Sequence, residues 1–324
     1  MSDDLFVTVG IPTCDNADTV GRTLRSLLDA ERQPDRILVV DASSDDTPEV
    51  IERVAAEYDV PVDCYRQSDE GRGVGAARQD IYERFDGDLL ACLDTEVAVD
   101  DDWLAEHVAF HREHPDVDVL SAAPMAGVDG PVTDPKRGFW FQQANCTVKR
   151  EALARIDGWD RWLPRGEDWD AQIRLWRSGA DAYARSDLDG ESMTDETPAE
   201  SLRKTWGRPS SVAFVRKYGR WYVGFHPEHV LGDVGSVGAL GLLVLGLFAL
   251  PTFPPLGLVM LALAALPTLP YLYLKKVKHR DGGFIREDAY DAARFYLLGV
   301  TAARELLVGT DRPWNYGGCD GPRG

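Results

Sequence analysis

The fold is decided by the stretch Leu89-Leu90-Ala91-Cys92-Leu93-Asp94-Thr95-Glu96. Its five apolar residues stand between turn residues, a pattern that predicts a short buried strand. Asp94 and Glu96 then lie at the carboxyl end of that strand, where open α/β sheets bind their ligands. Two carboxylates placed there suit a divalent cation that keeps coordination positions for phosphate oxygens. An acidic loop on an acidic protein is the alternative explanation of the same pair.

Apolar segments alternate with segments of helical periodicity on both sides of this stretch. Strands are predicted at residues 5–11, 36–40, 60–65, 88–93, 117–123 and 146–149, with a last edge strand at 183–187. Helices are predicted at residues 18–30, 48–58, 71–84, 103–114, 150–156 and 171–178. Strands that alternate with helices predict an α/β fold with a doubly wound, mostly parallel sheet.

Four loops of this predicted sheet carry polar residues that face one crevice. Pro12 and Thr13 follow the first strand, Asp41 follows the second, and the acidic pair follows the fourth. Glu167 and Asp168 precede the helix predicted at 171–178. A charge pair favoured by the dipole at a helix start is the alternative explanation of these last two residues.

The charge of the chain limits its partners. The 324 residues carry a net charge of −19, so nucleic acid is excluded as a partner. Such an acidic surface is typical of a halophile, a cell whose cytoplasm is rich in salt and screens like charges. An ordinary acidic protein is the alternative. The five cysteines have no metal-type spacing and are expected to be reduced.

The composition changes after residue 200, which ends the predicted catalytic domain at residues 1–200. Residues 201–233 are basic and aromatic, as in a segment at a membrane interface. Residues 234–250 and 256–274 contain no charged side chain, and a proline-rich turn at 251–255 separates them. Within the range 234–274 they predict a transmembrane helical hairpin. A buried hairpin in a soluble protein is the alternative.

The tail at residues 275–324 orients this predicted anchor. Lysine and arginine at residues 275–280 are a positive-inside signal, which predicts a multi-pass protein of the cell membrane with a cytoplasmic catalytic domain. Residues 284–308 have an amphipathic pattern interrupted by charges, so an interfacial or docked helix is expected there.

Five motifs occur in a fixed order between about residues 5 and 180. They are Ile11-Pro-Thr-Cys-Asp-Asn-Ala-Asp-Thr-Val20, Val39-Val-Asp-Ala-Ser-Ser-Asp-Asp-Thr47, Gly73-Val-Gly-Ala-Ala-Arg-Gln79, Leu93-Asp-Thr-Glu96, and Gly166-Glu-Asp-Trp-Asp170 with Arg174. With these motifs the chain resembles inverting glycosyltransferases of GT-A fold, in the large family that contains cellulose synthase and the polyprenyl-phosphate sugar synthases. The resemblance implies a GT-A nucleotide-sugar-binding domain.

The resemblance also implies roles for single residues. The donor-binding residues would be Pro12, Thr13, Asp15, Asp41, Arg78 and Asp94. Asp94 and Glu96 occupy the family's metal-binding DxD motif and would hold Mg²⁺ or Mn²⁺, although glutamate replaces the second aspartate. The family's catalytic base falls on Asp168, next to Glu167. Cys14 and Asp15 stand where the family more often has Tyr or Arg and Asn.

The acceptor side is expected to be aromatic and basic. Its candidate residues are Trp140, Arg174, Arg203 and Arg208. Aromatic rings suit sugars, although tryptophans are as often core residues. Basic side chains near the predicted membrane segment suit a lipid phosphate, and anchoring to anionic lipid head groups explains them equally.

The sequence therefore predicts a hexosyltransferase that uses a nucleotide-sugar donor at the cytoplasmic membrane face. The acceptor would be a dolichol or polyprenyl phosphate or a lipid-linked glycan, in protein N-glycosylation or surface-glycan assembly. One alternative is a polysaccharide synthase, although two apolar runs are too few to line an export channel. The other is a non-catalytic membrane scaffold that kept the fold, which Glu96 favours and Asp168 opposes.

Overall fold

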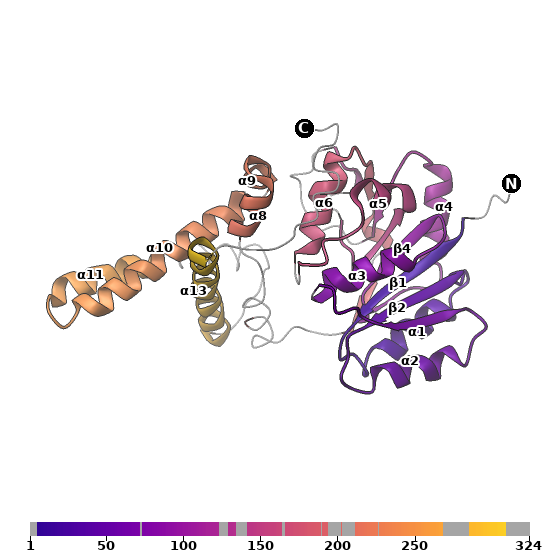
Figure 1. The fold of residues 1–324 in the computed structure, drawn as a ribbon, viewed down its shortest axis with the longest axis horizontal. Helices are drawn as coiled ribbons and strands as arrows, with labels where there is room; N and C mark the ends of the chain where they lie inside the picture. Colours follow the sequence, from indigo (N-terminus) through magenta and orange to yellow (C-terminus); the bar gives the residue numbers. More distant parts are fainter. Residues whose placement is uncertain are drawn as a thin grey trace. The chain divides into compact units, whose positions relative to one another are not determined.

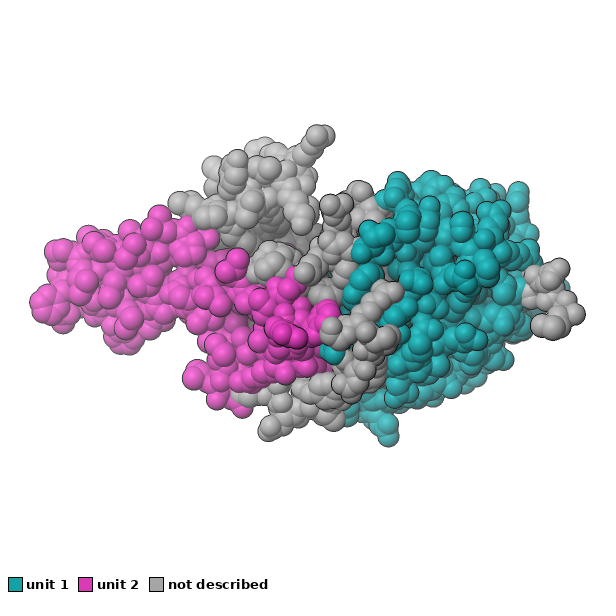
Figure 2. Space-filling model, turned by 90° about the horizontal axis from the view of Figure 1, so that it is seen from above, with its two compact units in different colours: residues 1–195, 313–324 teal, residues 196–312 magenta. Residues whose placement is uncertain are grey.

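The computed structural model describes residues 5–71, 73–122, 129–133, 141–163, 166–188, 190–193, 202, 211–225, 227–267 and 285–308. These residues fall into two compact units. Those of the first unit lie within residues 1–195 and those of the second within 196–312 (Figure 2).

The first unit is built on a sheet of eight strands (Figure 1). The strands are β1 (Val7–Thr13), β2 (Arg36–Asp41), β3 (Val62–Arg66), β4 (Leu89–Leu93), β6 (Val119–Ser121), β7 (Gly130–Pro131), β8 (Asn145–Lys149) and β9 (Ala182–Ala184). Their order across the sheet is β3-β2-β1-β4-β8-β6-β9-β7.

The direction of the strands divides this sheet into two parts. Neighbours from β3 to β4 are parallel. Strand β8 is antiparallel to both β4 and β6, and β7 is antiparallel to β9. The α/β class is thus confirmed, but the sheet is mixed rather than mostly parallel, because β8 enters between β4 and β6 in the reverse direction. The predicted edge strand near residue 183 is also wrong in place, since β9 lies between β6 and β7.

Helices cover both faces of the sheet (Figure 1). They are α1 (Val20–Leu28), α2 (Thr47–Ala55), α3 (Gly73–Arg84), α4 (Trp103–Glu113), α5 (Arg150–Ile156) and α6 (Glu167–Arg177). Alternate strand residues point to opposite faces, so Ile37 and Val39 pack with α1, α2 and α4, while Leu38 and Val40 pack with α3, α5 and α6. Burial on both faces explains why the central strands are continuous apolar runs.

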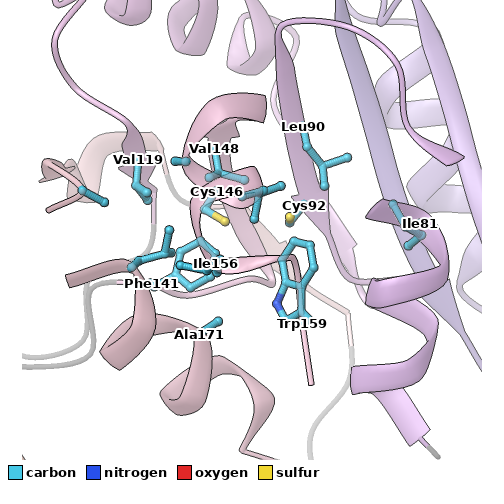
Figure 3. Close-up of a cluster of buried hydrophobic side chains, with 14 of the residues drawn as sticks. Ile81, Leu90, Cys92, Val119, Phe141, Cys146, Val148, Ile156, Trp159 and Ala171 are labelled. Atoms are coloured by element: carbon cyan, nitrogen blue, oxygen red, sulfur yellow. The ribbon is translucent and has the colours of Figure 1, made fainter. Parts of the chain in front are cut away.

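Two cysteines lie opposite each other in the second of these cores. Cys92 of β4 and Cys146 of β8 are paired in register, and their sulfur atoms face the same apolar cluster as Phe141 and Trp159 (Figure 3). Both are free and buried, whereas Cys14 and Cys64 are free and exposed. The described cysteines are therefore reduced thiols, as expected.

Helix α4 is attached to β8 through a polar contact inside the protein. His107 Nδ1 and His111 Nε2 each lie 2.9 Å from Oγ1 of Thr147. Both rings are buried, at 0% and 3% exposure. The hydroxyl can donate one proton to one ring and accept one from the other, so its two contacts are compatible with two neutral histidines.

A short antiparallel pair of strands follows the acidic turn. β5 (Val97–Ala98) pairs with β10 (Glu191–Ser192), and the amide of Met193 donates to the carbonyl of Glu96. The chain near residue 191 thereby holds the segment directly after Glu96. Neither strand is evident from the sequence, because two-residue strands have no periodicity.

The second unit is helical. Its described helices are α8 (Ser211–Tyr218), α9 (Arg220–Phe225), α10 (Pro227–Ala249), α11 (Pro254–Ala265) and α13 (Ile285–Val308). The amides of Thr252 and Phe253 donate to the carbonyl of Ala249 in the turn between α10 and α11. Glycines let these two helices touch, since a Cβ on Gly257 would lie 2.7 Å from the Cα of Leu250.

Helices α13 and α8 pack on α10 through specific contacts. A Cβ on Gly299 of α13 would lie 2.6 Å from the carbonyl oxygen of Ser236. The predicted amphipathic helix is therefore docked on α10. At the start of α8, the amide and hydroxyl of Ser211 each donate to Oδ2 of Asp233 at 2.7 Å. The buried carboxylate of Asp233 thus caps α8.

Within the described part of the chain, one helix is long and apolar enough to cross a membrane, at His229–Ala249. The shorter apolar helix Pro254–Ala265 covers only the first half of the second predicted span, and residues 268–274 of that span lie outside the described residues. A helical hairpin is present, but two membrane-spanning helices are not established, and the predicted multi-pass arrangement is not supported.

Candidate active site

The glycines at the start of α3 bring this helix against the segment before α6. A Cβ on Gly75 would lie 2.7 Å from the carbonyl oxygen of Asp160 and 3.3 Å from the Cβ of Glu167, and closer still to the carbonyl of Leu163. A side chain at position 75 would therefore push the two segments apart. This close approach explains Gly75, and a positive φ of 64° explains Gly73.

Arg78, one turn further along α3, joins two parts of the predicted site. Its Nη2 donates to Oδ1 of Asp94 at 2.8 Å, and its Nε lies 3.6 Å from Oε1 of Glu167. Its Nη1 donates to the carbonyl of Gln143 at 3.2 Å. The side chain of Arg78 is only 5% exposed. A buried guanidinium thus holds together the carboxyl end of β4 and the first turn of α6.

Glu167 and Asp168 occupy that first turn, because α6 begins four residues earlier than predicted. Glu167 is buried, and burial followed by the charge of Asp168 raises its pKa to about 8, although Arg78 acts in the opposite direction. Glu167 is therefore harder to ionise than an exposed glutamate. Asp168 is half-buried, with Oδ1 accepting the amide of Trp169 at 2.7 Å. It is the more exposed member of the pair.

The loop after β1 is joined to the loop after β2. Pro12 and Thr13 end β1 and are buried. Asp15 adopts a left-handed backbone (φ 54°), which aspartate tolerates better than most residues. Its amide donates to Oγ of Ser43 at 2.7 Å, and its Oδ1 accepts the amide of Ser44 at 2.7 Å. The Asp15 side chain is therefore used to shape the loop.

Asn16 connects these two loops to the acidic turn, a role that the sequence analysis missed. Its side-chain Oδ1 accepts a hydrogen bond from the hydroxyl of Thr95 at 2.9 Å, and its backbone amide donates to Oγ1 of Thr47 at 2.9 Å. The carbonyl of Thr95 accepts the hydroxyl of Thr23 at 2.9 Å. Thr95 is thus anchored inside while its two acidic neighbours remain partly exposed. The threonine between the two acidic residues was the sign in the sequence that this turn is anchored to the protein interior.

Asp41 lies below the surface rather than on it. Its Oδ1 accepts the amide of Ser43 at 3.1 Å, and its Oδ2 accepts Nη1 of Arg66 at 3.2 Å. Its side chain is 3% exposed. The predicted direct contact of Asp41 with a donor is therefore not available in this structure, and Arg66 covers it.

The acidic turn fits a divalent cation that arrives with a diphosphate. Asp94 is 41% exposed although one of its oxygens binds Arg78, and Glu96 is half-buried. Across the described ranges, no group of three or more His, Cys, Asp or Glu side chains is gathered around a metal position. Mg²⁺ is commonly held by one or two carboxylates, with phosphates and water completing its shell. Asp94 and Glu96 match this incomplete donor set.

The structure describes only one of the four predicted acceptor residues, Arg174. Arg174 is fully buried, where it pairs with Asp170 at 2.8 Å and donates to the carbonyl of Ile156. This burial contradicts a contact with an acceptor, because the guanidinium is used to hold α6 onto α5. Trp140, Arg203 and Arg208 lie outside the described residues.

Known proteins share this architecture. Residues 8–162 match the family described as Glycosyl transferase family 2. The chain is similar to mannosyltransferase PcManGT from Pyrobaculum calidifontis, with 18% identity, a TM-score of 0.60, and coverage of 94% of this chain and 88% of that one. It is also similar to S. aureus TarS 1–349, with 14% identity, a TM-score of 0.54, and coverage of 95% and 98%.

At these identities the solved structures show the fold alone. No curated protein matches the chain in sequence. The predicted GT-A domain is confirmed by the family match and by the shared fold.

Proposed function

We propose that this hexosyltransferase, which carries a glycosyl transferase family 2 domain, moves a sugar from a nucleotide donor to a lipid-linked acceptor. The transfer would invert the configuration of the sugar's anomeric carbon. The acceptor class would be a dolichol or polyprenyl phosphate or a lipid-linked glycan. The observation that carries this proposal is the joining of Asp94 and Glu167, with its neighbour Asp168, through the buried Arg78.

The first requirement of the reaction is to stabilise the departing diphosphate. Asp94 and Glu96 would hold Mg²⁺ or Mn²⁺, which when bound neutralises negative charge on phosphate oxygens. Arg78 fixes the orientation of Asp94 through a 2.8 Å hydrogen bond. PcManGT is described in complex with GDP-Man and Mn²⁺, and TarS with UDP, which supports a nucleotide-sugar donor and a divalent cation here.

The second requirement is to activate the acceptor. Asp168 would take the proton of an attacking hydroxyl, a contribution typically worth about 10²–10⁴-fold in rate. The raised pKa of Glu167 disfavours a second negative charge beside it. Attack from the side opposite the diphosphate inverts the anomeric carbon. A lipid monophosphate is already ionised, so toward that acceptor Asp168 would serve to orient it.

A membrane location suits this acceptor class. Helix α10 is long and apolar enough to cross a membrane, and Phe248 and Phe253 at its far end are 78% and 67% exposed. We keep the division into a catalytic domain (1–200), an interfacial segment (201–233), a membrane hairpin (234–274) and a cytoplasmic tail (275–324). A salt-rich cytoplasm and a role in N-glycosylation or surface-glycan assembly complete the proposal.

The test uses membranes that contain the full chain. Labelled UDP- and GDP-sugars are added with and without EDTA, and the label entering the chloroform phase is measured. We expect transfer that EDTA abolishes and Mn²⁺ restores.

Two variants separate catalysis from folding. Asp168→Asn is expected to lower the rate with a hydroxyl acceptor by about 10²–10⁴-fold. Asp116→Asn, an exposed aspartate beyond the end of α4, is the matched control and should transfer normally. Full activity of Asp168→Asn with such an acceptor would refute the assignment of the base.

A further inference from the structure

Arg66, at the end of β3, is an exposed cation tethered to a buried anion. Its side chain is 66% exposed, whereas that of its partner Asp41 is 3% exposed. Toward the described residues, Nη1 of Arg66 donates to Oδ2 of Asp41 at 3.2 Å and to the carbonyl of Ser43 at 2.5 Å. The guanidinium is thus tethered at one nitrogen while most of the side chain remains exposed.

The place of Arg66 on the sheet relates it to the donor. The strands β3, β2, β1 and β4 are parallel neighbours, so their carboxyl ends lie at one edge. At about 4.8 Å between strands, the end of β3 lies roughly 14 Å from the end of β4, where Asp94 stands. A nucleoside diphosphate with its diphosphate at Asp94 would extend its nucleoside across β1 and β2 toward β3.

Other contacts connect Arg66 with the loop expected to receive the nucleoside. The loop after β1 is bonded to Ser43, the residue whose carbonyl Arg66 binds. Burial and nearby aspartates raise the pKa of the Cys14 thiol in this loop, and the charge of Arg66 opposes them. Arg66 therefore lies beside both loops that frame this end of the site.

We propose that Arg66 contacts the nucleobase of the donor and that Asp41 positions Arg66. This proposal rests on the proposed glycosyltransferase function. A guanidinium only donates hydrogen bonds, so it favours a base edge that accepts them. At the edge that carries position 4 of a pyrimidine or position 6 of a purine, guanine presents O6 and N7 and uracil presents O4, whereas cytosine and adenine present a donating amino group there. Facing this edge of the base, Arg66 favours uridine or guanosine donors over cytidine and adenosine donors.

The experiment measures binding of UDP, GDP, CDP, ADP and pyrophosphate to the full chain by calorimetry in the presence of Mn²⁺. The wild-type chain should bind UDP or GDP at least tenfold more tightly than CDP and ADP. Arg66→Ala should weaken binding of the preferred nucleotide about tenfold, the effect of losing one charge-assisted hydrogen bond. It should change pyrophosphate binding by no more than about twofold, and it should raise the donor KM while leaving kcat unchanged.

Further variants keep the test informative. Arg53→Ala removes one positive charge from the exposed face of α2 and should bind every ligand as the wild type does. Arg66→Gln retains donor groups without the charge, and it replaces Arg66→Ala if the latter fails to fold, with an intermediate loss expected. Equal weakening of nucleotide and pyrophosphate, or unchanged nucleotide binding, would show that Arg66 only neutralises Asp41. A wild-type chain that binds no nucleotide would overturn the proposed function as well.

Discussion

Acidification is expected to destabilise the catalytic unit through the buried pair His107 and His111. Burial is the main cause that lowers their pKa values, to about 3 for His107 and about 4 for His111. Positive charge on His111 adds to the effect at His107, and that of Lys149 adds to it at His111. Their shared partner, the hydroxyl of Thr147, can satisfy two neutral rings but not two cations.

The size of the effect follows from the difference between folded and unfolded pKa values. An unfolded histidine has a pKa of about 6.5, so the unfolded chain binds protons first as the pH falls. The stabilisation is fully present above pH 6.5 and is lost as the pH decreases toward 4 and then 3. At pH 5, about 1.5 units below the unfolded pKa, each ring lowers the free energy of unfolding by about 2 kcal/mol, and the pair lowers it by about 4 kcal/mol. Domains are stable by only about 5–15 kcal/mol, so this loss is large.

The assay is urea unfolding of the full chain at pH 8, 6 and 5. The double variant His107→Gln/His111→Gln should be less stable at pH 8 but should lose about 4 kcal/mol less than the wild type between pH 8 and pH 5. His111→Gln alone should show about half of that difference, and it provides the test if the double variant does not fold. Arg112→Gln, an exposed change on the same helix that removes no group titrating between pH 8 and pH 5, is the control and should keep the wild-type pH dependence. Identical pH dependence in the double variant and the wild type would refute the reasoning.

Three further predictions concern contacts described above. Gly75→Ala should cost about 1–3 kcal/mol of unfolding free energy and reduce sugar transfer, because its Cβ would overlap backbone carbonyls. Gly238→Ala, whose Cβ would meet nothing within 4 Å, should be tolerated, and equal effects of the two changes in thermal unfolding would contradict this. Thr95→Val should raise the donor KM about fivefold, because it removes the hydrogen bond from the Thr95 hydroxyl to Asn16. Thr95→Ser keeps this hydroxyl and should keep the wild-type KM. A serine variant as impaired as the valine variant would argue against a role for this hydrogen bond. Asp233→Ala should lower the unfolding free energy by about 1–3 kcal/mol, because it leaves the amide of Ser211 buried without its cap, and an unchanged thermal midpoint would count against the cap.

The parallel half of the sheet was predictable from the sequence. Strands β1, β2 and β4 are apolar on both faces and separated by helices, so length and composition identify them. The antiparallel entry of β8 was not predictable, because Asn145–Lys149 contains no signal for which strand it joins or in which direction. The pairing of β5 with β10 depends on residues almost 100 positions apart, which no local pattern reveals.

The site was predictable where residue type and strand end coincide. Asp94 and Glu167 belong to separate motifs, and the structure brings them to one arginine, as expected for loops at a single sheet edge. Arg174 was misjudged, although Asp170 four residues earlier was a visible sign of an internal ion pair. Arg66 was missed because its importance depends on a partner in another strand, Asp41, that is itself covered.

The side-chain amide of Asn16 has a consequence for how such enzymes diverge. It bonds the loop after β1 to Thr95, while the backbone amide bonds to Thr47 at the start of α2. A change at position 16 alone leaves the hydroxyl of Thr95 without this acceptor, whereas a change at position 95 still leaves Oδ1 of Asn16 with the hydroxyl of Thr13 and the amide of Cys14. Among relatives, position 95 should therefore vary more freely than position 16, even where the rest of both loops drifts.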